Sequence, residues 1–300
     1  MFESKYLALV NNVCIMPQNS NIHTYWDEAT SSAIGQTLVA DISDGTLPLL
    51  TTRKIAWRSI VYELLWFTTG SQSIDYLQFY KVHIWDKNAS NQSWNARNLG
   101  TRPSPNYIGP SYGYQWRYGI FGDQLSNCVY NLIHYPCSRR ILMCSWTPES
   151  VHKTVLPPCH FTVQFLIKDD SLHIVVYMRS GDLILGIPFN IVSYSLLTNI
   201  IAALLGIKPG TVTIMIGDAH VYADHMYSYV NIQQNREILP PPKYDISWLK
   251  TRFNRYTPLS DIALFWDNLH KYDEVIIAGL REYMCHDPIK YEMVNTSLIN

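Results

Sequence analysis

The spacing of apolar and polar residues along the chain predicts both helices and strands. Over residues 56–70 apolar side chains recur every three or four positions, which predicts an amphipathic helix. Residues 159–167 and 171–179 instead alternate apolar and polar positions on either side of a charged turn, which predicts a β-hairpin. Residues 190–205 are almost wholly apolar but too short to cross a membrane, so we expect a helix at the centre of the molecule.

Helices and strands are mixed along the chain without the regular strand–helix–strand repeat of a parallel sheet. We therefore predict an α+β fold, and we treat residues 1–300 as a single domain. The remaining predicted elements are helices over 5–14 and 124–135, strands over 140–146 and 211–217, a strand, turn and strand over 36–52, and a long loop over 88–110.

Composition narrows the class of protein. The 300 residues are 47% hydrophobic and 16% charged, as in a compact globular protein, and a net charge of -1 argues against non-specific binding to nucleic acid. The first residues lack the basic and apolar stretches of a signal peptide, and no run of 18 apolar residues occurs, so we expect no membrane span. The six cysteines form no Cys-x-x-Cys pair, and the histidines never fall at His-x-x-x-His. We therefore expect reduced thiols, a cytoplasmic location and no metal site.

The most informative segment is Leu156-Pro157-Pro158-Cys159-His160, at the start of the predicted hairpin. The two prolines fix φ and supply no N–H, so the backbone before Cys159 should be stiff and extended. A thiol held in this way can be aimed at a substrate as a nucleophile. Buried cysteines are also common as inert small apolar residues, so this segment alone leaves both interpretations open.

Further short motifs lie before and after this segment. They are Thr51-Thr52-Arg53-Lys54, Glu63-Leu64-Leu65-Trp66-Phe67, Ile84-Trp85-Asp86, Gly109-Pro110-Ser111-Tyr112-Gly113-Tyr114-Gln115-Trp116-Arg117, Ser138-Arg139-Arg140, Arg179-Ser180-Gly181-Asp182, Pro188-Phe189-Asn190 and Gly217-Asp218-Ala219-His220-Val221-Tyr222. Their order and spacing closely resemble those of thymidylate synthase and its relatives, the pyrimidine-nucleotide C5 methylases and hydroxymethylases. The resemblance covers about residues 5–294.

The resemblance implies a thymidylate synthase fold, in which a large mixed β-sheet is flanked by helices and two copies of the chain form a homodimer through their sheets. It implies C5 methylation of a uracil nucleotide, foremost the conversion of dUMP to dTMP, with 5,10-methylenetetrahydrofolate as carbon donor and reductant. Two alternatives stay within the family: a nucleotide 5-hydroxymethylase, or a C5 transferase specific for UMP or CMP in a specialised pathway. An alternative from another class is an inactive nucleotide- or RNA-binding paralogue.

The resemblance also implies catalytic roles for six residues. Carbon C5 of uracil becomes nucleophilic only after a thiolate adds to C6, and Cys159 matches the family's nucleophile. Arg179 matches a cation that favours this thiolate and also contacts the nucleotide phosphate. Asn190 matches the amide that reads the uracil edge, although an asparagine there also suits a helix N-cap. The residues matched to a network that moves protons through ordered water are Glu63, Tyr112 and His160.

Further residues are matched to contacts with the two substrates. Arg139 and Arg140 match a pair that one subunit donates to the phosphate in the other subunit's site, and adjacent guanidiniums suit a phosphate. His220 and Tyr222 match the pair that bonds the sugar 3′-hydroxyl. The whole nucleotide-binding set is Arg139, Arg140, Gln164, Arg179, Ser180, Gly181, Asp182, Asn190, His220 and Tyr222.

The folate-binding set implied by the resemblance is Trp85, Leu156, Asp182 and Gly186. Asp182 matches a carboxylate that pairs with the N–H groups of the pterin. The large ring of Trp85 would exclude water from the reacting carbon, so hydride transfer would prevail over hydration. This favours a methyl product over a hydroxymethyl product.

The chain departs from the family pattern at two places. Family members carry an arginine in a loop that closes over the phosphate. Its place here falls at about Tyr25, and no Lys or Arg occurs between Lys5 and Arg53. We expect either His23 or Arg53 to replace it, or the substrate to be presented differently. Six residues also follow the family's usual end at Val294, which would alter closure of the site.

Overall fold

A five-stranded β-sheet forms one layer of the computed structural model, which describes residues 1–16 and 29–291. Its strands are β1 (Thr30–Asp41), β2 (Leu142–Cys144), β3 (His160–Lys168), β4 (Ser171–Asp182) and β5 (Lys208–Tyr222). The order across the sheet is β1-β5-β4-β3-β2. Strands β4 and β5 run parallel, and the other neighbours are antiparallel, so the sheet is mixed.

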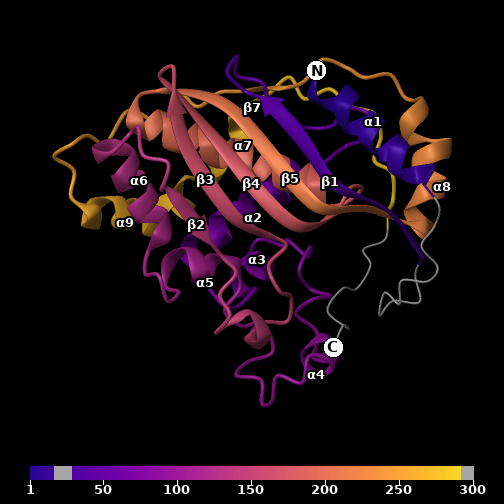
Figure 1. Cartoon of the computed structure of the whole chain (residues 1–300), viewed down its shortest axis with the longest axis horizontal. Coiled ribbons are helices and arrows are strands. Elements are labelled where there is room, and N and C mark those ends of the chain that lie inside the picture. Colours follow the sequence, from indigo (N-terminus) through magenta and orange to yellow (C-terminus); the bar gives the residue numbers. More distant parts are fainter. Residues whose placement is uncertain (17–28, 292–300) are drawn as a thin grey trace.

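Helices pack behind this sheet. The helices are α1 (Phe2–Cys14), α2 (Trp57–Thr69), α3 (Asp75–Phe79), α4 (Asn91–Ala96), α5 (Tyr112–Arg117), α6 (Gln124–His134), α7 (Gly186–Leu205), α8 (Ala223–Asn231), α9 (Leu259–Asn268) and α10 (Asp273–Ala278). A small second sheet pairs β6 (Lys243–Tyr244) with β7 (Leu280–Arg281). In Figure 1 the strands form the front layer, and α2 and α7 lie behind them. The predicted α+β fold, a mixed sheet flanked by helices, is confirmed.

Helix α7 is the central helix predicted from the apolar run, and it begins four residues earlier than expected. The N-cap position belongs to Leu185, so the interpretation of Asn190 as a helix N-cap is wrong. Asn190 instead lies one turn inside the helix. The expectation that this segment is too short to cross a membrane is wrong, because α7 has the length and composition to do so, but 83% of its most apolar window is buried inside the molecule. A helix that is apolar on all sides suits such a central position.

Only one of the two strands predicted over residues 36–52 forms. Strand β1 ends at Asp41, whose carboxylate accepts a hydrogen bond from the N–H of Ser43 at 3.0 Å. Beyond this turn the N–H of Leu47 bonds to the carbonyl of Pro242. Leu47 is fully buried, so the apolar pattern there reports burial and not a second strand.

Other boundaries also differ from the prediction. The loop predicted over 88–110 contains α4, because the side chain of Ser90 caps it by accepting from the N–H of Ser93 at 3.1 Å. The strand predicted over 140–146 shortens to β2. Strand β5 extends well beyond 211–217, because it pairs with β1 on one side and β4 on the other. The helices predicted over 5–14, 56–70 and 124–135 and the hairpin over 159–179 are confirmed.

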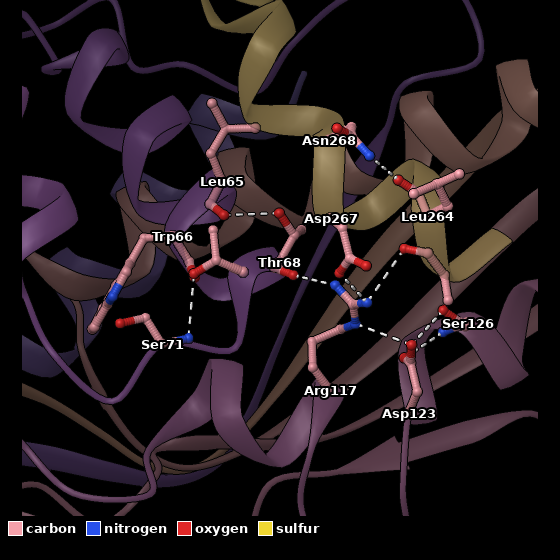
Figure 2. A network of polar contacts seen from close by, with 12 residues as sticks. Leu65, Trp66, Thr68, Ser71, Arg117, Asp123, Ser126, Leu264, Asp267 and Asn268 are labelled. Atoms are coloured by element: carbon pink, nitrogen blue, oxygen red, sulfur yellow. Dashed lines mark hydrogen bonds and ion pairs between the residues drawn. The ribbon is translucent and has the colours of Figure 1, made fainter. Parts of the chain in front are cut away.

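The buried guanidinium of Arg117 ties the end of α2 to two other helices (Figure 2). It donates to the carbonyl of Thr68 in the last turn of α2. It also forms ion pairs with Asp123, the N-cap of α6, at 3.1 Å and with Asp267 of α9 at 2.8 Å. Because α2 also carries Glu63, this network sets the position of that carboxyl group in the fold.

The outer face of the sheet exposes apolar side chains. Tyr177 of β4 and Met215 of β5 are directly paired and are 41% and 43% exposed. Val39 of β1 and Leu142 of β2 lie on the same face and are exposed as well. Exposed apolar side chains on a sheet face are typical of a surface that contacts another protein.

Candidate active site

The thiol of Cys159 lies where β3 begins, beside the neighbouring strand β4. Nη2 of Arg179 donates to its Sγ at 3.5 Å. The same guanidinium donates to the carbonyl oxygens of Pro157 at 2.8 Å and Pro158 at 2.9 Å. It also lies over the ring of Trp146, 5.7 Å from the ring centroid. The two proline carbonyls therefore hold a guanidinium beside the sulfur.

Tyr112 contacts both Cys159 and His160. Its hydroxyl oxygen accepts the backbone N–H of Cys159 at 2.8 Å, and its ring stacks on that of His160 with 4.1 Å between centroids. Nδ1 of His160 lies 2.6 Å from the hydroxyl oxygen of Tyr194. Burial raises the pKa of Tyr112 well above 10 and lowers the pKa of His160 to about 3. Both side chains are therefore neutral near pH 7.

Glu63 is buried on α2 and accepts a hydrogen bond from a tryptophan. Nε1–H of Trp85 donates to Oε1 of Glu63 at 2.7 Å. Burial raises the pKa of this carboxyl group to about 7, although the bond from Trp85 acts in the opposite direction. A carboxyl group with such a pKa can both accept and return a proton near neutral pH. The ring of Trp85 also lies edge-on to Tyr112, with 6.1 Å between centroids.

The turn between β4 and α7 gathers three of the residues predicted to contact substrates. Oδ1 of Asp182 accepts from the N–H groups of Ile184 at 2.8 Å and Leu185 at 3.1 Å, so one of its oxygens shapes the turn. A Cβ on Gly186 would stand 3.6 Å from Oδ1 of Asn190, which places the Asn190 amide next to this turn. Within residues 1–16 and 29–291 that amide has no hydrogen-bond partner, so it can serve a ligand.

The ends of β4 and β5 bring further predicted residues side by side. His220 is the register partner of Asp182. Its Nδ1 lies 3.1 Å from Oδ1 of Asp218, and its ring is edge-on to Tyr222 with 5.2 Å between centroids. The predicted nucleotide contacts on these strand ends are Arg179, Ser180, Gly181, Asp182, His220 and Tyr222.

Three predicted nucleotide contacts lie away from this chain's own thiol. Arg139 and Arg140 are exposed just before β2, and Nε2 of Gln164 donates to the carbonyl of Arg139 at 2.8 Å. Gln164 is five residues along β3 from Cys159, which corresponds to about 16 Å of extended chain. The structure therefore groups Gln164 with the arginine pair and not with the thiol. The role of all three in binding phosphate or base remains a prediction.

The candidates for replacing the missing arginine fall in different places. Arg53 is buried, its guanidinium donates to the carbonyl of Ile184, and it lies 5.1 Å from the ring centroid of Tyr291. Arg53 thus contacts the β4–α7 turn, and a role in holding phosphate stays a prediction. The positions of His23, Tyr25 and the residues after Val294 lie outside the described residues.

Sequence reasoning missed two residues of the site. Tyr194 lies four residues after Asn190 on α7, so the two share a helix face. A tyrosine in a buried helix needs a partner for its hydroxyl, and this was a signal in the sequence. Trp146 lies beneath Arg179, and no pattern in the sequence pairs these two distant positions. Leu156, the remaining predicted folate contact, is half-buried against the core.

A thiol beside a fixed guanidinium, a buried carboxyl group of raised pKa and an open amide are a combination typical of enzymes. The chain belongs to the thymidylate synthase family, whose model matches residues 4–295. The members of this family are methyltransferases, and so is this chain.

Three relatives show how far the likeness extends. Human thymidylate synthase is 40% identical over 212 residues, which cover 66% of this chain and 67% of that protein. Thymidylate synthase 1/2 of Encephalitozoon cuniculi is 37% identical over 254 residues, covering 80% and 83%. Thymidylate synthase of Mycoplasma genitalium is 35% identical over 290 residues, covering 89% and 97%.

Proposed function

We propose that this chain methylates dUMP to dTMP, with 5,10-methylenetetrahydrofolate as both carbon donor and reductant. The observation that carries the proposal is the 3.5 Å contact between the Arg179 guanidinium and the Cys159 sulfur. This contact places a cation beside the thiol that we propose adds to C6, a step without which C5 of uracil does not react. The open amide of Asn190 supports uracil as the base, because one amide can accept from N3–H and donate to O4.

We assign the following roles to the site residues. The thiolate of Cys159 adds to C6 of the ring, and the electron pair displaced from the C5–C6 bond makes C5 nucleophilic. Asn190 holds the N3–O4 edge during this step. Glu63, with a pKa of about 7, exchanges a proton with the ring through water. The folate, when bound, supplies the one-carbon unit and the hydride that become the methyl group.

The folate is proposed to lie along Trp85, Leu156, Asp182 and Gly186. Asp182 uses Oδ1 within the turn, which leaves its second oxygen for a donor on the pterin. The ring of Trp85 is held in place by its bond to Glu63, so it can exclude water from the reacting carbon. This supports a methyl product over a hydroxymethyl product.

We also propose a homodimer that forms through the outer face of the sheet. The exposed Tyr177 and Met215 supply apolar area, and Arg139 and Arg140 lie exposed near one edge of the same sheet. An isologous interface would carry the arginine pair of one subunit toward the phosphate site of the other. A cytoplasmic location is part of the same proposal.

The function is tested by incubating the purified protein with methylenetetrahydrofolate and, in separate reactions, dUMP, UMP, dCMP or CMP. Products are identified by mass, with the Cys159→Ser protein as the blank. We expect a gain of one methyl group on dUMP alone. Methylation of UMP or CMP, or a hydroxymethyl product, would replace the proposal by the corresponding family alternative. No product from any nucleotide would favour an inactive binding paralogue.

A further inference from the structure

Tyr194 is a buried residue of α7 whose hydroxyl group forms a hydrogen bond with His160. Its side chain is 2% exposed, and its hydroxyl oxygen lies 2.6 Å from Nδ1 of His160. No other hydrogen bond of this hydroxyl occurs within the described part of the chain. Burial, reinforced by the nearby charge of Glu63, raises the pKa of Tyr194 well above 10, so the phenol keeps its proton.

His160 is neutral and can therefore carry its single N–H on either ring nitrogen. The ring is stacked flat on Tyr112, with an angle of 14° between the planes, and Phe67 packs against it at 6.0 Å between centroids. The titratable groups in direct contact with its ring are Tyr112 of α5 and Tyr194 of α7. Glu63 of α2 lies near Tyr194, and Cys159 and Arg179 lie near Tyr112.

The contact with Tyr194 discriminates between the two tautomers. If Nδ1 carried the proton, it would donate to the tyrosine oxygen, and the buried O–H of Tyr194 would be left with no acceptor among the described residues. A buried hydroxyl proton without an acceptor is costly. If Nδ1 is unprotonated, it accepts the phenolic proton, and the N–H on Nε2 is left for water or a ligand. The second arrangement places the imidazole proton on Nε2.

We propose that Tyr194 is a positioning residue that locks His160 in the Nε2–H tautomer, so that this ring offers the site a hydrogen-bond donor. The inference rests on the proposed function, because it gives this donor to the water or carbonyl oxygen at the pyrimidine ring. Asn190 lies one turn earlier on the same face of α7. One helix thus carries both the amide that reads the base and the residue that orients the neighbouring imidazole.

The tautomer is measured directly by NMR on protein labelled with ¹⁵N-histidine, with the His160 signals assigned by their loss in His160→Gln. In the wild-type protein at pH 7 we expect the nitrogen shifts and two-bond couplings of an Nε2–H imidazole. The Nδ1–H pattern in the wild-type protein would overturn the proposal by itself. This readout needs no substrate, so it remains valid even if the proposed methylation is not observed.

The role of Tyr194 is tested with Tyr194→Phe, which keeps the ring and removes the hydroxyl. We expect His160 to become a mixture of tautomers and kcat for dUMP to fall about tenfold, with KM changed less than about twofold. Tyr229→Phe is the matched control, since Tyr229 is also fully buried and donates to Leu7 and Asn11. The control should keep both the His160 tautomer and kcat. A single Nε2–H tautomer and unchanged kcat in Tyr194→Phe would overturn the proposal.

Discussion

At the scale of single residues, the carboxyl group of Glu63 keeps its proton in the folded state at pH values where the unfolded chain would release it. Burial raises its pKa from the usual 4.5 to about 7, so between these two pH values the folded state binds more protons than the unfolded state. Its contribution to stability is therefore complete below pH 4.5 and is lost as pH rises through 7. The group that we propose exchanges protons with the substrate is also one that destabilises the fold when ionised.

We expect Glu63→Gln to flatten this pH dependence. The free energy of unfolding of the wild-type protein, relative to the variant, should fall by about 2–3 kcal/mol between pH 5 and pH 8. Denaturant unfolding of both proteins at the two pH values measures the change, and effects of His160 cancel in the difference. A wild-type minus variant difference that does not vary with pH would show that Glu63 is ionised throughout this range.

The thiol of Cys159 is expected to be essential for turnover but not for the fold. Cys159→Ser keeps the shape of the side chain and removes the thiolate, so kcat for dUMP should fall by at least about 10³-fold. The thermal midpoint and the dissociation constant for dUMP should stay near their wild-type values. Residual turnover within tenfold of wild type would mean that the nucleophile is another residue.

Asn190 is expected to set the preference for uracil. Asn190→Asp replaces the NH₂ donor by an oxygen, so the ratio of dUMP to dCMP affinity should fall by about 10–100-fold. Asn190→Ala is the control, because it removes the amide without adding a carboxylate and should weaken both nucleotides. Titrations of the two variants with dUMP and dCMP measure the ratio. An unchanged ratio in Asn190→Asp would show that this side chain does not read the base.

At the scale of elements, Arg117 connects helices that are far apart in the sequence. It bonds to the last turn of α2, to the start of α6 and to α9 through Thr68, Asp123 and Asp267 (Figure 2). Because the guanidinium is buried, its removal leaves a carbonyl and a partly buried carboxylate without their partner. Arg117 thus helps to fix the end of α2, the helix that also carries Glu63.

We expect Arg117→Met to lower the free energy of unfolding by about 3 kcal/mol. Arg58→Met is the matched control on α2 itself, because Arg58 is exposed and bonds mainly to the carbonyl of Tyr80. The control should lose less than about 1 kcal/mol. Denaturant unfolding of the two variants provides the comparison, and equal losses would contradict the special role of the buried network.

At the scale of the whole molecule, one face of the sheet packs on helices and the other exposes apolar side chains. The site lies at one end of β3, β4 and β5, whereas Arg139, Arg140 and Gln164 are grouped elsewhere on the sheet. A single chain therefore leaves the predicted phosphate site without its arginine pair. A second copy docked on the open face would supply it.

Mixing inactive proteins tests whether the pair crosses the interface. Arg140→Ala and Cys159→Ser should each be nearly inactive alone, whereas random heterodimers should recover about a quarter of wild-type activity. This is because half of the dimers are mixed, and each has one site with neither lesion. Glu63→Gln mixed with Cys159→Ser is the control and should recover nothing, since both residues belong to the chain's own site. A failure of the Arg140 mixture, with heterodimers demonstrated, would place Arg140 in its own subunit's site.

The sequence by itself determined the helices and strands in which apolar residues recur at regular intervals. In these elements the regular spacing places the apolar residues on the one face that the fold buries. The helix over 56–70 and the hairpin over 159–179 formed as predicted. The predicted hairpin also has Cys159 and Arg179 at its two outer ends, whereas the roles of Cys159, Arg179 and Asp182 were implied by the family resemblance. The prediction of a second strand over 36–52 was wrong. Buried leucines there have the spacing of a strand, but the backbone forms its hydrogen bonds outside the main sheet.

Only the tertiary structure decided how these residues act on one another. Whether Glu63 is ionised depends on burial and on Trp85, 22 positions away, and neither is visible in local spacing. The Tyr194–His160 contact joins residues 34 positions apart through the packing of α7 behind the sheet. Charge state and hydrogen-bond direction depend on the surroundings in three dimensions. The sequence therefore determined which chemical groups this enzyme has, and the fold determined the protonation state in which each one meets the substrate.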